Sequence, residues 1–125
     1  MRRILITGSR DWTDETAVHT LILAEAFNLP PGEVVVIHGD CTTGADVIAD
    51  AFARKQGYTV EAYPADWSQG RKAGPLRNQH MVDLGADICL AFPLPGSRGT
   101  LGCMKMAHRA GISLRVWSTT HDRDR

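Results

Sequence analysis

The sequence predicts one α/β domain, built as a mostly parallel sheet of about five strands with helices on both faces. Short runs rich in β-branched residues alternate along the chain with stretches of helical periodicity, which is the pattern of parallel strands joined by helices. The strand-like runs are apolar on both faces, as in a sheet covered on two sides. The length of 125 residues suits one domain. We expect this domain at residues 1–117 and a polar tail at residues 118–125.

The expected elements follow one another in a regular order. Five apolar runs are expected to be strands, at residues 3–7, 33–38, 58–63, 87–92 and 112–117. Four stretches with apolar residues at helical spacing are expected to be helices, at residues 14–27, 45–56, 75–84 and 100–109. The first run ends at Gly8, and Thr13 is the expected N-cap of the first helix. Gly57 closes the second helix and Pro75 begins the third. Residues 65–74 lack apolar periodicity and are expected to be a loop.

Charge is divided unevenly along the chain although the total is zero. Residues 1–70 hold 5 basic and 10 acidic side chains, whereas residues 71–115 hold 7 basic and 2 acidic ones. A neutral total argues against a general nucleic-acid binder, which is usually basic. A basic half joined to an acidic half favours a local anion site.

Cysteine usage and hydropathy indicate the compartment. Cys41, Cys89 and Cys103 are too few and too scattered for a disulfide framework or a zinc site, so we expect no metal. No apolar run approaches the ~20 residues that cross a bilayer, and the N-terminus lacks the apolar core of a signal peptide. We therefore expect a cytoplasmic protein without a membrane partner.

A glycine-rich loop at residues 95–100 follows the fourth expected strand. Ligands of open parallel sheets bind outside the carboxyl ends of the strands, and glycines let backbone amides turn toward an anion. The last two expected helices have no acid in the first turn, whereas Arg77 lies in the first turn of the third. We expect a phosphate or carboxylate between the two helix starts, with Arg77 as a bidentate partner. The alternatives are a tight turn without a ligand and an arginine on a solvated helix face.

The loop after the first strand carries Gly8, Ser9 and Arg10. It lacks the Gly-x-Gly-x-x-Gly spacing, so a standard NAD site is not expected. Ser9 and Arg10 can reach a sugar or phosphate, or they belong to a structured loop around a buried tryptophan. Trp12 and Trp67 lie on ligand-side loops, where each can stack on a base or pack over the edge of the sheet.

The loop after the second strand, at residues 38–46, is rich in acids, hydroxyls and glycines. Gly39, Asp40, Gly44 and Asp46 suit ribose or base recognition, although Asp46 is equally well explained as a first-turn acid of the next helix. His38 ends an apolar strand and is better explained as a hydrogen-bonded core histidine than as a catalyst. A triad of Cys41, His38 and Asp40 is disfavoured because adjacent strand residues point to opposite faces.

Four motifs in order resemble one known family. They are Gly-Ser-Arg-Asp-Trp, His-Gly-Asp…Gly-Ala-Asp, Ala-Asp-Trp…Gly-Arg-Lys-Ala-Gly-Pro-Leu-Arg-Asn-Gln-His-Met and Phe-Pro…Pro-Gly-Ser-Arg-Gly-Thr. Together they resemble the YspA/YpsA-related branch of the SLOG superfamily, which also includes LOG phosphoribohydrolases and DprA-type proteins. The resemblance covers residues 3–117 and implies a Rossmann-like fold that binds nucleotide-derived ligands. It also implies a bacterial or phage source and a homo-oligomer. If the protein is encoded by a phage, we expect it in the cytoplasm of the host cell.

The resemblance to LOG enzymes fails at one position. Those enzymes carry Pro-Gly-Gly-x-Gly-Thr-x-x-Glu after a helical Arg, and by this resemblance Arg77 corresponds to the Arg. Cys103 stands where the motif has Glu. A carboxylate stabilises the oxocarbenium-like state of N-glycosidic cleavage, so its loss argues against LOG-type hydrolysis unless Asp40 or Asp46 replaces it.

These observations favour a sensor or binding module for a nucleotide or nucleotide-derived ligand, such as ADP-ribose, a cyclic nucleotide or a nucleoside monophosphate. The expected ligand-binding residues are Gly8, Ser9, Arg10, Gly39, Asp40, Gly44, Asp46, Trp67, Arg77, Asn78, Gly96, Ser97, Gly99 and Thr100. The alternative is a hydrolase of an N-glycosidic or phosphate bond, with Arg77, Asp40 and Asp46 as catalytic candidates. Single-stranded DNA binding is a third hypothesis, and no further cofactor is assigned.

Overall fold

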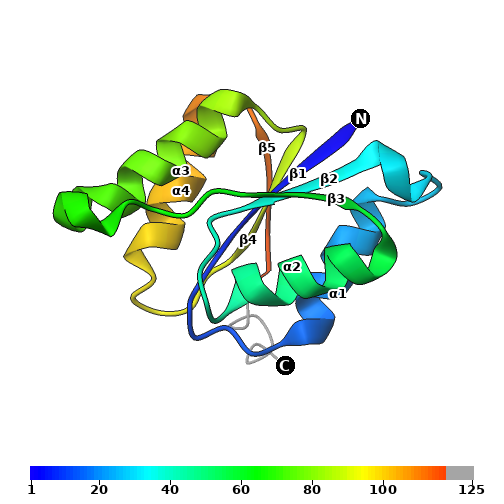
Figure 1. The fold of residues 1–125 in the computed structure, drawn as a ribbon, viewed down its shortest axis with the longest axis horizontal. Coiled ribbons are helices and arrows are strands. Elements are labelled where there is room, and N and C mark those ends of the chain that lie inside the picture. Colours follow the sequence, from blue (N-terminus) through cyan, green and yellow to red (C-terminus); the bar gives the residue numbers. More distant parts are fainter. Residues whose placement is uncertain (118–125) are drawn as a thin grey trace, which may run out of the picture.

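A computed structural model describes residues 1–117 as a three-layer α/β domain (Figure 1). The sheet contains β1 (Arg2–Gly8), β2 (Val34–His38), β3 (Thr59–Ala62), β4 (Ile88–Phe92) and β5 (Ser113–Val116). The helices are α1 (Glu15–Glu25), α2 (Ala45–Gln56), α3 (Ala73–Leu84) and α4 (Arg98–Arg109), with 3-10 turns η1 (Pro31–Glu33) and η2 (Trp67–Lys72). The expected tail at residues 118–125 lies outside the described residues.

All four strand pairs are parallel, and the strand order is β3-β2-β1-β4-β5. The predicted fold class, a Rossmann-like sheet covered on both faces, is therefore confirmed. From β1 the chain adds β2 and then β3 toward one edge of the sheet. It then crosses back, so that β4 and β5 lie on the other side of β1. The direction of winding reverses between β1 and β4, which is where open sheets of this kind leave a crevice for ligands.

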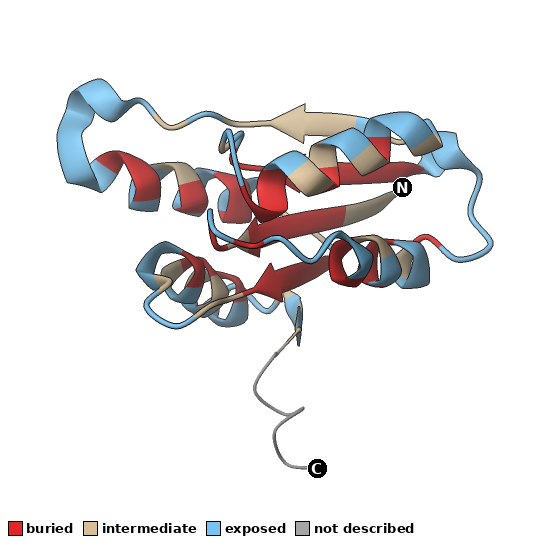
Figure 2. Cartoon of the chain, turned by 90° about the horizontal axis from the view of Figure 1, so that it is seen from below, coloured by how far each residue is buried: buried red, intermediate tan, exposed pale blue. Residues whose placement is uncertain are grey.

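Alternation along the strands divides the core into two layers. Ile4 and Ile6 of β1 pack with α1 and α2, whereas Leu5 between them packs with α3 and α4. The central strands are the most buried part of the domain (Figure 2). Each fully buried aliphatic side chain contributes about 1.5–3 kcal/mol to folding. The two layers thereby fix the carboxyl ends of the central strands as a rigid platform.

Several predicted boundaries were wrong, and local polar contacts explain why. Asp14, not Thr13, is the N-cap of α1, because its carboxylate accepts a hydrogen bond from the amide of Ala17 at 3.1 Å. Residues 65–74 are not a plain loop, since they contain η2 and the first residues of α3. The Asp66 side chain starts η2 by accepting from the amide of Ser68, which apolar periodicity does not detect. α4 begins two residues earlier than predicted.

No helix within residues 1–117 has both the length and the apolar character needed to cross a membrane.

Candidate functional site

A cleft of about 500 Å³ opens at the carboxyl ends of β1, β2 and β4. Its walls are the loops that follow these three strands, together with η2 and the start of α3. The volume lies within the range of ordinary small-molecule sites. The crevice expected at the reversal of strand order is thus present, and it lies between the starts of α3 and α4.

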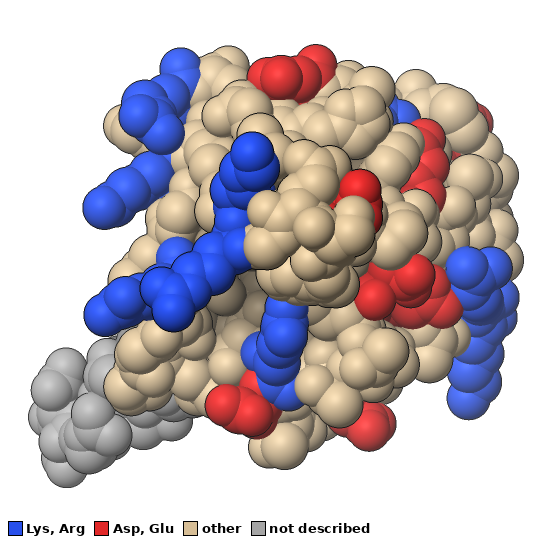
Figure 3. Space-filling view, turned by 60° about the vertical axis from the view of Figure 1, so that its left-hand side comes forward, with Lys and Arg blue, Asp and Glu red and all other residues tan. Residues whose placement is uncertain are grey.

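Positive charge without an internal partner gathers around this cleft. Four arginines line it and form no ion pair with any described carboxylate, namely Arg10, Arg71, Arg77 and Arg98. Four arginines away from the cleft each pair with a carboxylate, namely Arg2, Arg3, Arg54 and Arg115. Figure 3 shows Lys and Arg side chains around a hollow on this side of the molecule. Unneutralised guanidinium groups facing a cleft attract an anion.

Buried polar side chains are also concentrated here. Five of the six buried polar residues among those described line the cleft, namely Thr7, Ser9, Asp46, Asn78 and Thr100. The sixth, His38, supports the cleft from behind. Burial of polar groups is unfavourable unless they are hydrogen-bonded, so their accumulation at one place indicates a role other than stability.

The loop from β4 into α4 presents backbone amides to the cleft. Gly96 has φ of 83°, a left-handed conformation that favours glycine. The Ser97 hydroxyl accepts from the amide of Leu94 at 3.1 Å and so holds the loop closed. The amides of Gly99 and Thr100, in the first turn of α4, have no acceptor within the described part of the chain. No acid lies in that turn, so these amides and the helix dipole remain available to an anion.

Arg77 is held in place by the backbone of two strand ends. Its Nη1 donates to the carbonyl oxygen of Gly39 after β2 and, at 3.3 Å, to that of Tyr63 after β3. Its Nε donates to Oδ1 of Asn78 at 2.9 Å, and Nδ2 of Asn78 donates to the carbonyl of Gly99 at 3.4 Å. Carbonyl groups fix the guanidinium without neutralising its charge. Asn78 thereby joins Arg77 to the start of α4.

Asp46, in the first turn of α2, has a buried carboxylate. Its Oδ2 accepts from the amides of Gly39 at 3.1 Å and Cys41 at 3.3 Å, which fixes the loop between β2 and α2. Burial raises the pKa of Asp46, and the hydrogen bond from the amide of Cys41 acts in the opposite direction. Asp46 is therefore a first-turn acid of α2 that also lines the cleft, and its role in ribose or base recognition stays a prediction.

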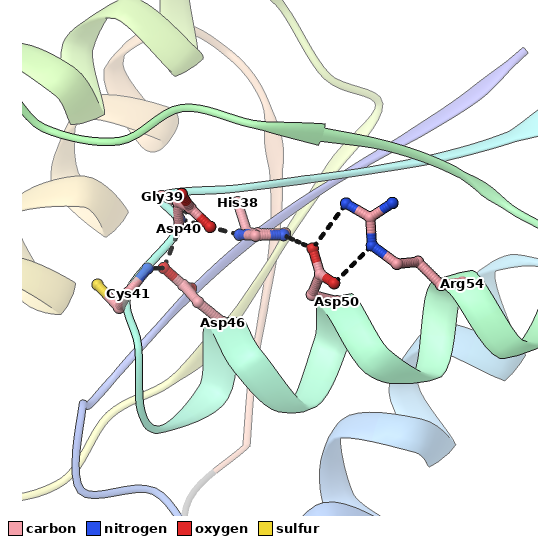
Figure 4. A network of polar contacts seen from close by, with 7 residues as sticks. All are labelled: His38, Gly39, Asp40, Cys41, Asp46, Asp50 and Arg54. Atoms are coloured by element: carbon pink, nitrogen blue, oxygen red, sulfur yellow. Dashed lines mark hydrogen bonds and ion pairs between the residues drawn. The ribbon is translucent and has the colours of Figure 1, made fainter.

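A network behind the cleft orders the same loop (Figure 4). His38 is 1% exposed, its Nε2 lies 2.7 Å from Oδ2 of Asp50, and its Nδ1 accepts from the amide of Asp40 at 2.9 Å. Arg54 donates to Oδ1 of Asp50 at 2.7 Å, which lowers the pKa of Asp50. His38 is therefore the hydrogen-bonded core histidine that the sequence suggested. Its ring faces Asp50 and the Asp40 backbone, so no triad with Cys41 exists.

An aromatic side chain stands at the mouth of the cleft. Trp67 of η2 is 54% exposed, and its ring lies beside Gly74, at the start of α3. The guanidinium of Arg10 lies 5.2 Å from the centre of the Trp67 ring. Trp12, by contrast, is buried against Phe92 and belongs to the core. Of the two candidate stacking residues, only Trp67 is open to a ligand.

The structure brings together twelve of the fourteen predicted ligand-binding residues. Those that line the cleft are Gly8, Ser9, Arg10, Gly39, Asp46, Trp67, Arg77, Asn78, Gly96, Ser97, Gly99 and Thr100. Asp40 and Gly44 do not line it. Asp40 is exposed with φ of 57°, and Gly44 packs against the backbone of Ser9 and Arg10, where a side chain would not fit.

The cysteines have different surroundings. Cys103 is buried between α4 and the sheet with Cys89, so the position of the LOG glutamate does not line the cleft. Hydrogen bonding with Cys103 and burial raise the pKa of Cys89. Cys41 lines the cleft, and burial followed by the charge of Asp46 raises the pKa of its thiol. Cys41 therefore stays protonated near neutral pH and is a weak nucleophile.

Sequence reasoning missed several parts of the site. Thr7, the last buried side chain of β1, and Arg98 both line the cleft. Arg98 was detectable, since it lies within the glycine-rich loop motif. Asp50 was not, because an acid in the middle of a helix resembles any solvated residue. Within residues 1–117, no group of three or more His, Cys, Asp or Glu side chains is arranged to hold a metal ion.

Comparison with known proteins agrees with the motifs. The profile of the "YspA, cpYpsA-related SLOG family" matches residues 2–70. The chain belongs to this family. It is also similar to the Gene 61 protein of Mycobacterium phage D29, with 52% identity over 118 residues, 90% of this chain and 93% of that protein. An alignment of that length extends beyond residue 70, into the half that carries α3 and α4.

Proposed function

We propose that this protein binds a nucleotide or nucleotide-derived ligand as a sensor or binding module. The phosphate lies on the loop at residues 96–100, where the amides of Gly99 and Thr100 are free, and Arg77 approaches it from the other side of the cleft. The observation that carries the proposal is the gathering of four arginines without internal partners around a cleft lined by buried polar groups. Membership of a SLOG family supports the same class of ligand.

Trp67 supports a ligand with a flat ring. Trp67 lies at the mouth of a basic cleft, and much of its apolar ring is left uncovered there. Stacking of a base on Trp67 provides that cover and is worth about 1–3 kcal/mol per base. Phosphate, sugar and base then lie along one path from the start of α4 to η2.

A second function, hydrolysis of an N-glycosidic bond by a phosphoribohydrolase-like reaction, is favoured by one observation. Asp46 lines the cleft near Arg77; burial raises the pKa of its carboxyl, and the charge of Arg77 partly opposes that rise. A carboxylate in this place can stabilise an oxocarbenium-like state in the manner of the missing motif glutamate.

Two further expectations from the sequence stay predictions, namely that the protein forms a homo-oligomer and that it is cytoplasmic.

Calorimetric titration with nucleoside mono- and diphosphates, cyclic nucleotides and ADP-ribose tests the proposal. We expect at least one of them to bind and to raise the unfolding temperature, because a ligand at 100 times its Kd adds about 2.7 kcal/mol. Arg98→Gln should weaken binding about tenfold or more, the typical loss of a charge-assisted hydrogen bond. Arg109→Gln removes the same charge from the other end of α4 and should leave binding unchanged.

The outcomes separate the alternatives. Absence of binding across the whole set contradicts the proposal. Release of free base or ribose phosphate during the titration, abolished by Asp46→Asn, would identify the hydrolase instead. Equal losses from Arg98→Gln and Arg109→Gln would indicate general attraction of anions to a basic surface.

A further inference from the structure

The carboxylate of Asp46 uses only part of its hydrogen-bonding capacity. Both amides that bind it, those of Gly39 and Cys41, donate to the same oxygen, Oδ2. Among the described residues no amide, hydroxyl or cationic group donates to Oδ1, and the further hydrogen bond of the carboxylate comes from the thiol of Cys41, which is a weak donor. Because Asp46 lines the cleft, the acceptor capacity that remains is available to a ligand there. The residue itself is only 6% exposed.

The helix-terminal role of Asp46 does not account for this arrangement. An exposed acid at the same position would serve the dipole of α2 equally well without desolvation. Burial instead raises the pKa of Asp46, so the folded protein keeps a carboxylate in unfavourable surroundings. Retention of an unfavourable polar group at a cleft is typical of a binding residue.

The surroundings restrict which ligand group meets Oδ1. An anionic group is repelled by the carboxylate, and a cationic group is repelled by Arg77 and the three other arginines of the cleft. A neutral donor remains, which means a hydroxyl or an amine of a base. Asp46 is almost fully buried where it lines the cleft, whereas Trp67, the side chain that suits a base, is largely exposed. The group that meets Asp46 is therefore the sugar.

Spacing agrees with this assignment. The loop at residues 96–100, proposed to hold the phosphate, follows β4. The loop between β2 and α2, which Asp46 fixes, follows β2, and both strands are neighbours of β1. Two strand spacings of about 4.8 Å separate the two loops by roughly 10 Å. This is the scale of a nucleoside monophosphate, so one ligand can place its phosphate at α4 and its sugar at Asp46.

We propose that Asp46 selects for the sugar of the ligand, by accepting a hydrogen bond through Oδ1 from a ribose hydroxyl. Ribonucleotides are then bound in preference to their deoxy forms. This inference rests on the proposed function, since it assumes a nucleotide in the cleft, but it adds a specific determinant that nucleotide binding alone does not require.

The test uses the four common nucleoside 5′-monophosphates, each in its ribo, 2′-deoxy and 2′,3′-dideoxy form, titrated into the wild-type protein. We expect the dideoxy form to bind about ten- to a hundredfold more weakly than the ribo form, since a hydrogen bond to a charged group is worth that ratio. Asp46→Asn keeps one oxygen for the amides of Gly39 and Cys41 but turns an NH2 group toward the cleft. The preference should then fall to within about threefold.

Asp83→Asn is the matched control, because it removes a carboxylate from the exposed end of α3 and should keep the full preference. Equal binding of the ribo and dideoxy forms by wild type overturns the inference and leaves nucleotide binding intact. A preference that persists in Asp46→Asn overturns the role of Asp46. Affinities that depend on the base of the nucleotide but not on its sugar also overturn the role of Asp46. Failure of every monophosphate to bind overturns the inference, and it contradicts the proposed function as well if the diphosphates, cyclic nucleotides and ADP-ribose also fail.

Discussion

Arg77 and Gly39 are in such close contact that a side chain on Gly39 would displace the guanidinium. Nη1 of Arg77 donates to the carbonyl oxygen of Gly39, and a Cβ built on Gly39 would lie 2.5 Å from that nitrogen and 2.6 Å from Cζ. The absence of a side chain on Gly39 therefore leaves the guanidinium of Arg77 its observed place. The strand end of β2 and the first turns of α3 form one unit through this contact.

Gly39→Ala is expected to weaken ligand binding to the same degree as Arg77→Ala, although Gly39 itself offers no side chain to a ligand. The added methyl group displaces the guanidinium, which then loses its contacts with the carbonyls of Gly39 and Tyr63. Loss of one placed guanidinium should cost about tenfold or more in Kd. Titration calorimetry on both variants measures the effect.

Gly32→Ala is the control for this substitution. Nothing lies within 4 Å of a Cβ at Gly32. Gly32 belongs to η1, at the end of β2 opposite to the cleft. Its binding should equal that of wild type, and its stability should stay within about 0.5 kcal/mol. If Gly39→Ala binds as well as Gly32→Ala, Arg77 does not hold the ligand.

The layered fold was predictable because its causes are local. The apolar runs that became β1, β2 and β4 are buried on both sides, and runs of that kind separated by helical periodicity leave few other folds. η2 was not predictable from the same pattern. It depends on the Asp66 side chain and on Gly70, with φ of 78°, and neither leaves an apolar period in the sequence.

The site was predictable where its chemistry depends on residues that are adjacent in the sequence. It was not predictable where the chemistry depends on how distant residues pack. The loop at residues 96–100 and Arg77 stood out because two helix starts lack acids. The removal of Asp40 from the cleft was not visible, because its left-handed φ turns it to solvent. The contact of His38 with Asp50 joins a strand to a helix twelve residues later, and no spacing rule distinguishes it from an exposed ion pair.

Asp46→Asn is expected to change how stability depends on pH. The pKa of Asp46 is raised in the folded protein above its ordinary value of 3.8, chiefly by burial. The stabilising contribution is therefore fully present below the unfolded pKa and is lost as pH rises through the folded one. The amide does not titrate, so the variant should gain free energy of unfolding relative to wild type as pH rises from about 3 to 7.

Urea denaturation at several pH values measures this difference, with Asp83→Asn as the comparison for an exposed carboxylate. A difference between wild type and Asp46→Asn that stays constant across the pH range would contradict the burial of a titrating Asp46. A free energy of unfolding that is higher in Asp46→Asn than in wild type at acid pH, but no longer higher near neutrality, would have the opposite sign. That result would contradict the burial of a titrating Asp46 as well.

His38→Leu is expected to disturb the cleft from behind. Leucine fills a similar buried space but removes the partner of the Asp40 amide and one of the two partners of the Asp50 carboxylate. The loss of these two bonds should destabilise the protein by about 1–3 kcal/mol. The effect on the ligand should be indirect, as a weaker Kd without altered ribo preference, because Asp46 remains. Chemical denaturation and titration calorimetry separate the two effects, and unchanged stability would contradict the network.

Trp67→Ala is expected to weaken nucleotide binding by about five- to a hundredfold, which corresponds to the loss of about 1–3 kcal/mol of base stacking. Stability should change by no more than about 0.5 kcal/mol, because the side chain is largely exposed and lies outside the core. Intrinsic fluorescence offers a second measurement, since Trp12 and Trp117 pack in the core layer of α1 and α2 and neither lines the cleft. Ligand-dependent quenching should be present in wild type and absent in Trp67→Phe, which keeps a ring for stacking and should retain most of the affinity. Quenching that survives this substitution would place the base elsewhere in the cleft.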